Sequence, residues 1–313
     1  MKIGLVIPCY NEEESLKYFY KETTKILKSM NCEYELLFVN DGSIDNTLNI
    51  IKKLANDSHV KYISFSRNFG KESAMYAGIC NVDGDYVAVI DADMQDPPKL
   101  LPEMVSILET GEYDSVATRR ENRFGEPKIR SWFARLFYKI MNRISETDIV
   151  DGARDYRLMK REMADAIISM KEYNRFSKGI YGWIGFRTYW LSFKNVERIA
   201  GETKWNFWKL FKYAIDGIIN FSTVPLTISS YLGFLTTILS ILAFIFIVVR
   251  KIVFGDPVSG WPSLVCIIVF WGGVQLLCIG MMGQYISKLY LEAKKRPHYI
   301  IKETNKMTVK KVD

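Results

Sequence analysis

Histidine and paired cysteine are scarce in this chain of 313 residues. The two histidines, His59 and His298, stand apart from other reactive side chains in the sequence, which argues against histidine-centred catalysis. Five cysteines occur without a C-x-x-C spacing, so neither a disulfide framework nor a zinc site is expected. Reduced thiols in a cytoplasmic compartment are the simpler interpretation.

Two common nucleotide-binding patterns are also missing. The sequence contains neither the G-x-G-x-x-G fingerprint of dinucleotide-binding proteins nor a P-loop. Hydride transfer and ATP hydrolysis therefore lose support as functions.

Charge is absent from two long segments, residues 217–249 and 257–287, which hold no Asp, Glu, Lys or Arg. A bilayer-spanning helix needs about 20 mostly apolar residues. We therefore expect two spanning helices, at 228–249 and 262–287, and exclude a purely soluble protein. Their late position excludes a signal peptide. Gly272, Gly273, Gly280 and Gly283 would allow close helix packing, also between subunits of a homo-oligomer.

Positive charge gathers around these segments, within a net charge of +7. Residues 288–313 hold eight basic and three acidic side chains, and residues 119–161 hold twelve and six. A nucleic-acid surface or a merely solvated tail would explain this, but the adjoining apolar runs favour an anionic lipid surface. The positive-inside rule places both ends of the chain in the cytoplasm.

The first part of the chain alternates short apolar runs with stretches of helical periodicity. The expected strands are 2–9, 35–39, 61–65, 86–90 and, more weakly, 114–118; the expected helices are 14–29, 47–56, 71–82 and 98–109. This alternation predicts an α/β fold with a mainly parallel sheet. Ligands of such folds bind beyond the carboxyl ends of the strands.

Two further stretches, 129–144 and 205–221, combine an apolar, aromatic-rich helical face with basic residues. Helices of this kind lie in a membrane interface. The alternative is that they pack on the sheet.

The sharpest chemical signal is Asp91-Ala92-Asp93, directly after the fourth apolar run. Side chains two apart in an extended chain point to the same face, and two carboxylates there repel unless a cation bridges them. Such hard oxygen ligands suit Mg²⁺ or Mn²⁺, which is commonly shared with substrate phosphates. The pair therefore indicates a metal-bound diphosphate leaving group.

Polar residues also follow the first two strands. Tyr10 would stack on a base, Glu12 would accept from ribose or base donors, and Asp41 would hold the base or ribose. Alone, these residues are equally explained as a helix start and an Asx-type turn. Polar motifs at three adjacent strand ends together favour a nucleotide pocket.

These residues carry a family resemblance. The chain resembles membrane-anchored glycosyltransferases of family 2 that act on a polyprenyl phosphate, of the dolichyl-phosphate mannose synthase and bactoprenol glucosyltransferase types. The matching segments are 7–13, 40–47, 66–78, 91–98, 154–159, 198–205 and the two apolar runs.

The resemblance implies a cytoplasmic GT-A domain at 1–204, a juxtamembrane helix at 205–225, two transmembrane helices within 226–287 and a basic tail at 288–313. It implies inverting, metal-dependent transfer of one sugar to undecaprenyl phosphate at the inner face of a bacterial cell membrane, for cell-envelope or wall glycans. UDP-glucose or UDP-N-acetylglucosamine is the favoured donor, with GDP-mannose as the alternative.

The resemblance also assigns site residues. It places Pro8, Tyr10, Glu12, Val39 and Asp41 around the nucleoside, and Asp91, Ala92, Asp93 and Gln95 around metal and diphosphate. Arg198 and Lys204 would neutralise phosphate, Arg119 and Arg130 would lie near the lipid phosphate, and Asp155 matches the proposed catalytic base. One departure is Asn40, where the family usually has an acid.

The ionisation of a phosphate monoester affects how important each of these residues is expected to be. A phosphate monoester has a second pKa of about 6, so a lipid phosphate is largely ionised and needs little help from a base. We therefore expect Asp91, Asp93, Arg198 and Lys204 to matter more than Asp155, which would orient the acceptor or an arginine.

Two other functions find less support in the sequence. A processive polysaccharide synthase is disfavoured, because the Q-x-x-R-W motif is replaced by Thr203-Lys204-Trp205 and only two apolar runs are present. A non-catalytic membrane adaptor is disfavoured by the intact pair Asp91 and Asp93.

Overall fold

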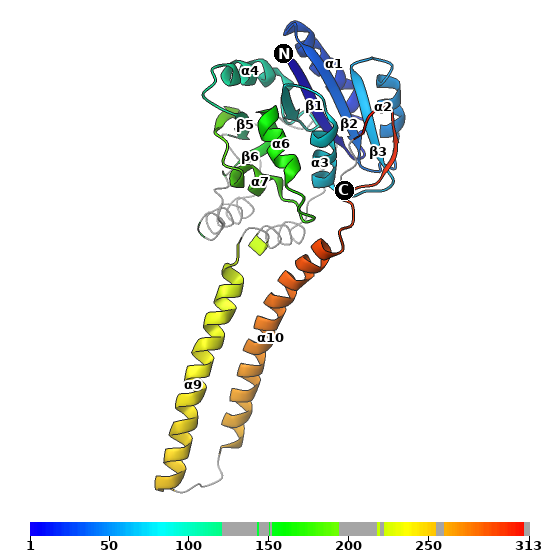
Figure 1. The fold of residues 1–313 in the computed structure, drawn as a ribbon. Coiled ribbons are helices and arrows are strands. Elements are labelled where there is room, and N and C mark those ends of the chain that lie inside the picture. The colour runs from blue at the N-terminus through cyan, green and yellow to red at the C-terminus, as the bar shows by residue number, and fades with distance from the viewer. Residues whose placement is uncertain are drawn as a thin grey trace.

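A mixed sheet of eight strands, in the order β7-β5-β6-β4-β1-β2-β3-β8, forms the body of the protein (Figure 1). The computed structural model describes residues 1–120, 152–193, 222–254 and 260–309, with residues 143, 150, 218 and 219. The strands are β1 (Lys2–Cys9), β2 (Glu33–Asn40), β3 (Val60–Phe65), β4 (Tyr86–Val89), β5 (Ser115–Arg120), β6 (Ala153–Lys160), β7 (Thr188–Phe193) and β8 (Ile301–Thr304).

The helices around the sheet follow the predicted alternation. They are α1 (Leu16–Ser29), α2 (Thr47–Leu54), α3 (Lys71–Asn81), the short η1 (Pro98–Leu100), α4 (Leu101–Glu109), α6 (Arg161–Ser169) and α7 (Ser177–Trp183). Strands β1 to β4 run parallel, which confirms the predicted α/β class and mainly parallel sheet. Two reversed strands were not predicted: β6 runs antiparallel to β4 and β5, and β8 runs antiparallel to β3.

The apolar strands are buried on both faces of the sheet. On β1, Ile3, Leu5 and Ile7 join a core with residues of α1, α2 and α4, while Val6 belongs to the opposite core with residues of α3 and α6. Side chains alternate between faces along a strand, so a run without polar interruptions fits only a sheet covered on both sides. Figure 1 shows helices on both faces.

The turn between β3 and α3 is fixed by a carboxyl group that follows β2. Asp41 is 3% exposed, and its two oxygens accept the backbone N–H groups of Phe69, at 2.6 Å, and Gly70, at 2.9 Å. Next to it, Gly42 has a φ of +65° and packs directly against Arg67 and Asn68. Burial raises the pKa of Asp41 to about 6, against the opposing effect of its two backbone hydrogen bonds.

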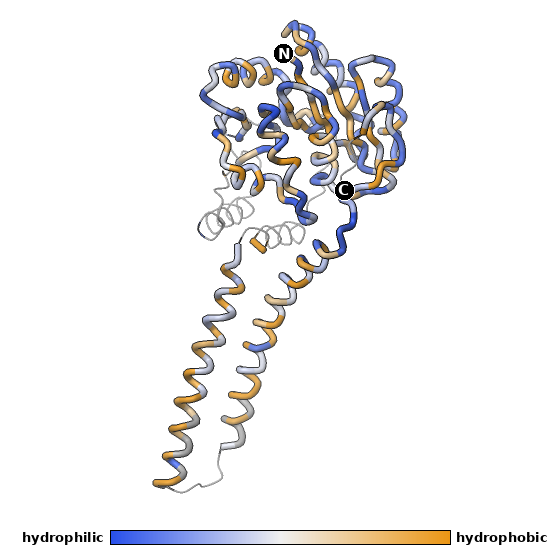
Figure 2. Tube along the Cα trace, in the orientation of Figure 1, coloured by the Kyte–Doolittle hydropathy of each residue, from blue (hydrophilic) through white to orange (hydrophobic). Residues whose placement is uncertain are grey.

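Two long helices, α9 (Val224–Phe254) and α10 (Trp261–Ala293), extend away from the sheet as a hairpin (Figure 1). Most of their described large apolar side chains are exposed, and Figure 2 shows hydrophobic residues along both helices. By length and composition both helices are able to cross a membrane. They contain the expected segments 228–249 and 262–287. The expected interfacial helices, 129–144 and 205–221, fall outside the described residues except at positions 143, 218 and 219.

The glycines of α10 make no tight contact within the described chain. A Cβ added at Gly272, Gly273, Gly280 or Gly283 would meet no described atom within 4 Å. Close packing through these glycines between subunits stays a prediction.

The chain returns to the sheet after α10. Strand β8 pairs with β3, where Thr304 Oγ1 donates to the Tyr62 carbonyl oxygen at 2.6 Å, and Ser66 N–H donates to the Ile300 carbonyl oxygen at 2.9 Å. Tyr299 is buried and its ring stacks on that of Phe65, with 4.9 Å between the centroids. The C-terminal segment therefore covers the edge strand from which the turn to α3 begins.

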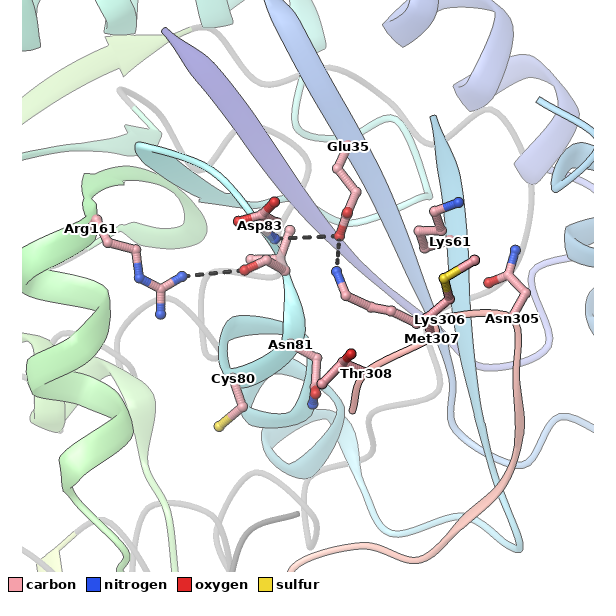
Figure 3. A pocket seen from close by; sticks show the side chains of 11 residues that line it. Glu35, Lys61, Cys80, Asn81, Asp83, Arg161, Asn305, Lys306, Met307 and Thr308 are labelled. Carbon is pink, nitrogen blue, oxygen red and sulfur yellow. Dashed lines mark hydrogen bonds and ion pairs between the residues drawn. The ribbon is translucent and has the colours of Figure 1, made fainter. Parts of the chain in front are cut away.

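A cavity of about 510 Å³ lies between this C-terminal segment and the amino ends of β2 and β3 (Figure 3). Glu35 accepts hydrogen bonds there from Lys306 Nζ and, at 3.3 Å, from Asp83 N–H. The predicted site residues follow the carboxyl ends of the parallel strands. This cavity therefore lies at the opposite, amino-terminal end of the strands.

Removing the Tyr299 ring should loosen the C-terminal segment. We expect Tyr299→Ala to lower the free energy of unfolding by about 3 kcal/mol, as for other buried aromatic truncations, and to lower the melting temperature. The neighbouring Ile300 is 54% exposed, so Ile300→Ala should change stability by less than about 0.5 kcal/mol. Equal melting temperatures for both variants in detergent would contradict this role.

The Asp41 carboxyl should give the protein a distinctive pH dependence. A group that ionises at about 6 when folded and at about 3.9 when unfolded stabilises the fold most below about pH 4. That contribution, up to about 3 kcal/mol, is lost as the pH rises through about 6. We expect the melting-temperature deficit of Asp41→Asn to be larger at acidic than at neutral pH.

The control for this measurement is Glu109→Gln, because Glu109 is an exposed acid at the end of α4. Its melting temperature should stay parallel to that of the wild type over the same pH range. A deficit of Asp41→Asn that does not vary with pH would show that Asp41 ionises alike in the folded and unfolded chain.

Candidate active site

The loops that follow β1 and β2 interlock at the carboxyl edge of the sheet. Asn11 N–H donates to Ser43 Oγ at 3.0 Å, and Ile44 N–H donates back to Asn11 Oδ1 at 3.0 Å. Glu12 N–H donates to Thr47 Oγ1 at 2.8 Å. Asn11 adopts a left-handed φ of 55°, which an asparagine tolerates better than most residues. The first two predicted motifs therefore lie side by side.

The five residues predicted around a nucleoside differ in how accessible they are. Tyr10 is 37% exposed, and Pro8 and Glu12 are partly exposed. Val39 is fully buried in the core and Asp41 nearly so, so the Val39 side chain would not reach a ligand in this conformation. Only its backbone is at the strand end.

Asn40 has a structural role at the end of β2. Its amide Nδ2 donates to Ser64 Oγ on β3 at 2.9 Å, while its Oδ1 accepts the N–H of Ser43 at 3.3 Å. The amide at this position therefore ties β2 both to β3 and to the turn that precedes α2.

The loop after β4 carries the two acids of the predicted metal site. Asp91 and Asp93 are partly exposed, whereas Ala92 between them is 2% exposed. Gln95 N–H donates to Asp93 Oδ1 at 3.0 Å, and the Gln95 side-chain oxygen accepts from Arg120 Nη2 at 3.0 Å. These bonds hold the loop over the end of the strand.

Lys71, the first residue of α3, joins this loop to β6. Its Nζ lies 2.8 Å from Asp91 Oδ2 and 2.6 Å from Asp155 Oδ2. Partial burial works to lower the pKa of Lys71, but the charges of Asp155 and Asp91 outweigh it and raise that pKa. Two acids 64 positions apart in the sequence thus share one ammonium group.

Asp155 enters the site from the reversed strand β6. Partial burial works to raise the pKa of Asp155, but the charge of Lys71, helped by Lys178, holds it well below its usual range. A carboxylate in such an ion pair is a weak proton acceptor. The orienting role expected for Asp155 stays a prediction.

A buried ion pair joins the loop after β4 to strand β6. Arg154 Nε donates to Asp96 Oδ1 at 2.7 Å, and the Asp96 side chain is fully buried. Burial raises the pKa of Asp96, against the charge of Arg154. Asp96 Oδ2 and Arg154 Nη2 have no hydrogen-bond partner among the described residues.

The acids present fit a hard divalent cation. The described part of the chain gathers no group of three or more His, Cys, Asp or Glu side chains that would hold a metal ion on its own. Two carboxylates alone leave most coordination positions to water and substrate phosphates, which is the usual arrangement for Mg²⁺. Asp91 and Asp93 therefore suit a cation that arrives with, or is completed by, a phosphorylated ligand.

The residues predicted to bind phosphate are only partly described. Arg119 is exposed on β5 and its Nε donates to Ser192 Oγ at 2.8 Å. Arg130, Arg198 and Lys204 lie outside the described residues.

Sequence reasoning gave no role to Lys71, Asp96, Arg120 or Arg154. Lys71 belongs to the segment 66–78 that carried the resemblance, and its place just after β3 was a usable signal. The pairing of Asp96 with Arg154 had none, because it depends on the reversed direction of β6.

Comparison with known proteins identifies the family. A family model described as glycosyl transferase family 2 matches residues 5–168. The putative glycosyltransferase CsbB of Bacillus subtilis is 44% identical over 97% of this chain and 92% of its own. The SfII prophage-derived bactoprenol glucosyl transferase of Shigella flexneri is 42% identical over 98% and 99%.

Solved structures are more distant. A glucosyl-3-phosphoglycerate synthase from Mycobacterium tuberculosis, in complex with Mn²⁺, UDP-glucose and phosphoglyceric acid, is 18% identical. It matches with a TM-score of 0.47 over 70% of this chain and 77% of its own.

The family model covers the strands and helices that carry the candidate site, from β1 to α6. The curated relatives extend the similarity through α9, α10 and the C-terminal segment, since they align with nearly the whole chain. The chain therefore belongs to glycosyltransferase family 2 and is a glycosyltransferase.

Proposed function

We propose that this enzyme transfers one glucose from UDP-glucose to undecaprenyl phosphate, with inversion at the anomeric carbon. The main support is the charged cluster of Asp91, Asp155 and Lys71 on a domain that also bears an exposed apolar hairpin. The names of relatives such as the bactoprenol glucosyl transferase of Shigella flexneri support glucose and a lipid acceptor. UDP-N-acetylglucosamine is the second donor, and GDP-mannose remains the alternative.

The hairpin gives the enzyme access to a lipid. Exposing a polyprenyl chain to water costs about 0.8 kcal/mol for each CH₂ group, so the enzyme must reach the phosphate at the bilayer surface. We propose that α9 and α10 anchor it there, with the catalytic domain (1–204), the juxtamembrane helix (205–225) and the basic tail (288–313) on the cytoplasmic side of the cell membrane. The basic residues beside the apolar runs support this orientation.

The chemistry asks for charge neutralisation more than for a base. The lipid phosphate, largely ionised near neutral pH, forms a bond to the anomeric carbon as the bond to the nucleoside diphosphate breaks on the opposite face. A divalent cation at Asp91 and Asp93, when bound, supplies positive charge to the departing diphosphate. Asp155 holds Lys71 in place, and Arg119, Arg130, Arg198 and Lys204 are proposed to neutralise phosphates.

The product, a polyprenyl-monophosphate sugar, would serve the modification of cell-envelope glycans. The intact carboxylate pair, together with membership of a transferase family, speaks against the adaptor function.

A donor panel tests the proposal. Purified protein in liposomes that contain undecaprenyl phosphate should transfer label from UDP-glucose, less from UDP-N-acetylglucosamine, and lose the transfer when a chelator is added. Preference for GDP-mannose would establish the alternative donor. Failure to label any lipid with any donor, in the presence of Mg²⁺ or Mn²⁺, would reject the proposal.

Substitution of Asp93 and of Asp155 should affect the rate of sugar transfer to different extents. We expect Asp93→Asn to lower kcat by about 100-fold or more, because it removes charge from the diphosphate site. Asp155→Asn should lower kcat by less than about tenfold, whereas loss of a true general base costs about 10²–10⁴. The reverse order, measured with UDP-glucose and undecaprenyl phosphate, would assign proton transfer to Asp155.

A further inference from the structure

The Lys71 ammonium is paired with the Asp91 carboxylate, which the proposed function assigns to a divalent cation. Its Nζ lies 2.8 Å from both oxygens of Asp91. The same nitrogen holds Asp155 at 2.6 Å. Asp91 belongs to the predicted metal pair, so in this conformation an ammonium group stands where positive charge from a cation would act.

An ammonium group and a divalent cation compete for one carboxylate. Both bind carboxylate oxygen, but two positive charges repel each other strongly at contact distance. A cation arriving alone at Asp91 must therefore displace Lys71 and leave the ammonium beside it without a new anionic partner. A cation arriving with a diphosphate brings the negative oxygens that would receive the ammonium.

The Lys71 ammonium group is free to move, whereas the backbone that precedes it is fixed. The preceding amides, Phe69 and Gly70, are fixed by Asp41, so the backbone at the start of α3 is anchored. The side chain is 43% exposed, and its four-carbon stem leaves the ammonium free to turn. Asp155 lies within reach of the same ammonium throughout.

We propose that Lys71 is an internal counter-cation that occupies Asp91 until the donor arrives, and that this makes cation and diphosphate bind together. On binding, the Lys71 ammonium leaves Asp91, keeps Asp155 and turns to a diphosphate oxygen. The inference rests on the proposed function in one respect, which is that Asp91 binds the cation of the sugar donor.

Direct metal titration tests this without any sugar transfer. The free Mn²⁺ signal in electron paramagnetic resonance gives the affinity of the full-length protein for Mn²⁺, alone and with inorganic pyrophosphate. Pyrophosphate presents a diphosphate without a base or sugar, so the unknown donor does not enter. Mn²⁺ binding to pyrophosphate itself is subtracted from titrations without protein.

In the wild type we expect pyrophosphate to raise Mn²⁺ affinity at least tenfold. Lys71→Met keeps the length of the side chain and removes its charge, so it should bind Mn²⁺ alone at least tenfold more tightly than the wild type. Pyrophosphate should then raise the affinity of this variant much less. Lys71→Arg keeps the charge and should retain the coupling.

The matched control is Lys178→Met, the same substitution at a second lysine near Asp155. Lys178 Nζ donates to the Ala153 carbonyl oxygen at 2.9 Å, and its charge acts on Asp155. It should leave Mn²⁺ affinity within about threefold of the wild type. An equal gain in both lysine variants would show a general field effect and overturn the proposal.

The wild-type measurement keeps the test decisive if Lys71→Met does not fold, which its melting temperature would reveal. Absence of coupling between Mn²⁺ and pyrophosphate in the wild type overturns the inference by itself, as does unchanged or weaker Mn²⁺ affinity in folded Lys71→Met. Coupling without glucosylation of any lipid would instead reject the proposed function alone. Glucosylation without coupling would reject only the role of Lys71.

Discussion

The ammonium of Lys71 balances the charges of Asp91 and Asp155, which enter the candidate site from the antiparallel strands β4 and β6. Two carboxylates at such short range repel each other, and one lysine between them satisfies both. The rest of the site serves this balance. Asp41 fixes the turn that delivers Lys71, and Asp96 with Arg154 supports the loop and strand that deliver the two acids.

Much of the catalytic domain was predictable, because its physical signals are local. The run 2–9 became β1 with the predicted bounds, and the helices predicted at 14–29 and 71–82 became α1 and α3 within two residues. Parallel strands buried on both faces produce uninterrupted apolar runs, which are easy to recognise. The position of Asp91 and Asp93 after β4 followed from the same pattern. Their neighbours in space did not.

What escaped prediction depends on contacts between distant segments. Strand β6 contains Arg154, Asp155 and Arg157, and a strand with so many charges lacks the apolar signature of its neighbours. The resemblance assigns Val39 to a nucleoside pocket, and because its side chain is buried in the core, that assignment stays a prediction about its backbone. The pairing of β8 with β3 joins residues about 240 positions apart, and no local pattern in a basic tail announces a strand.

The position of β8 in the chain determines when the sheet can be completed during synthesis. This strand closes the edge of the sheet but follows both α9 and α10 in the sequence. A ribosome therefore releases the last strand of this sheet only after the apolar hairpin has emerged. A chain that terminates before β8 would leave β3 as an open edge strand, a surface prone to aggregation.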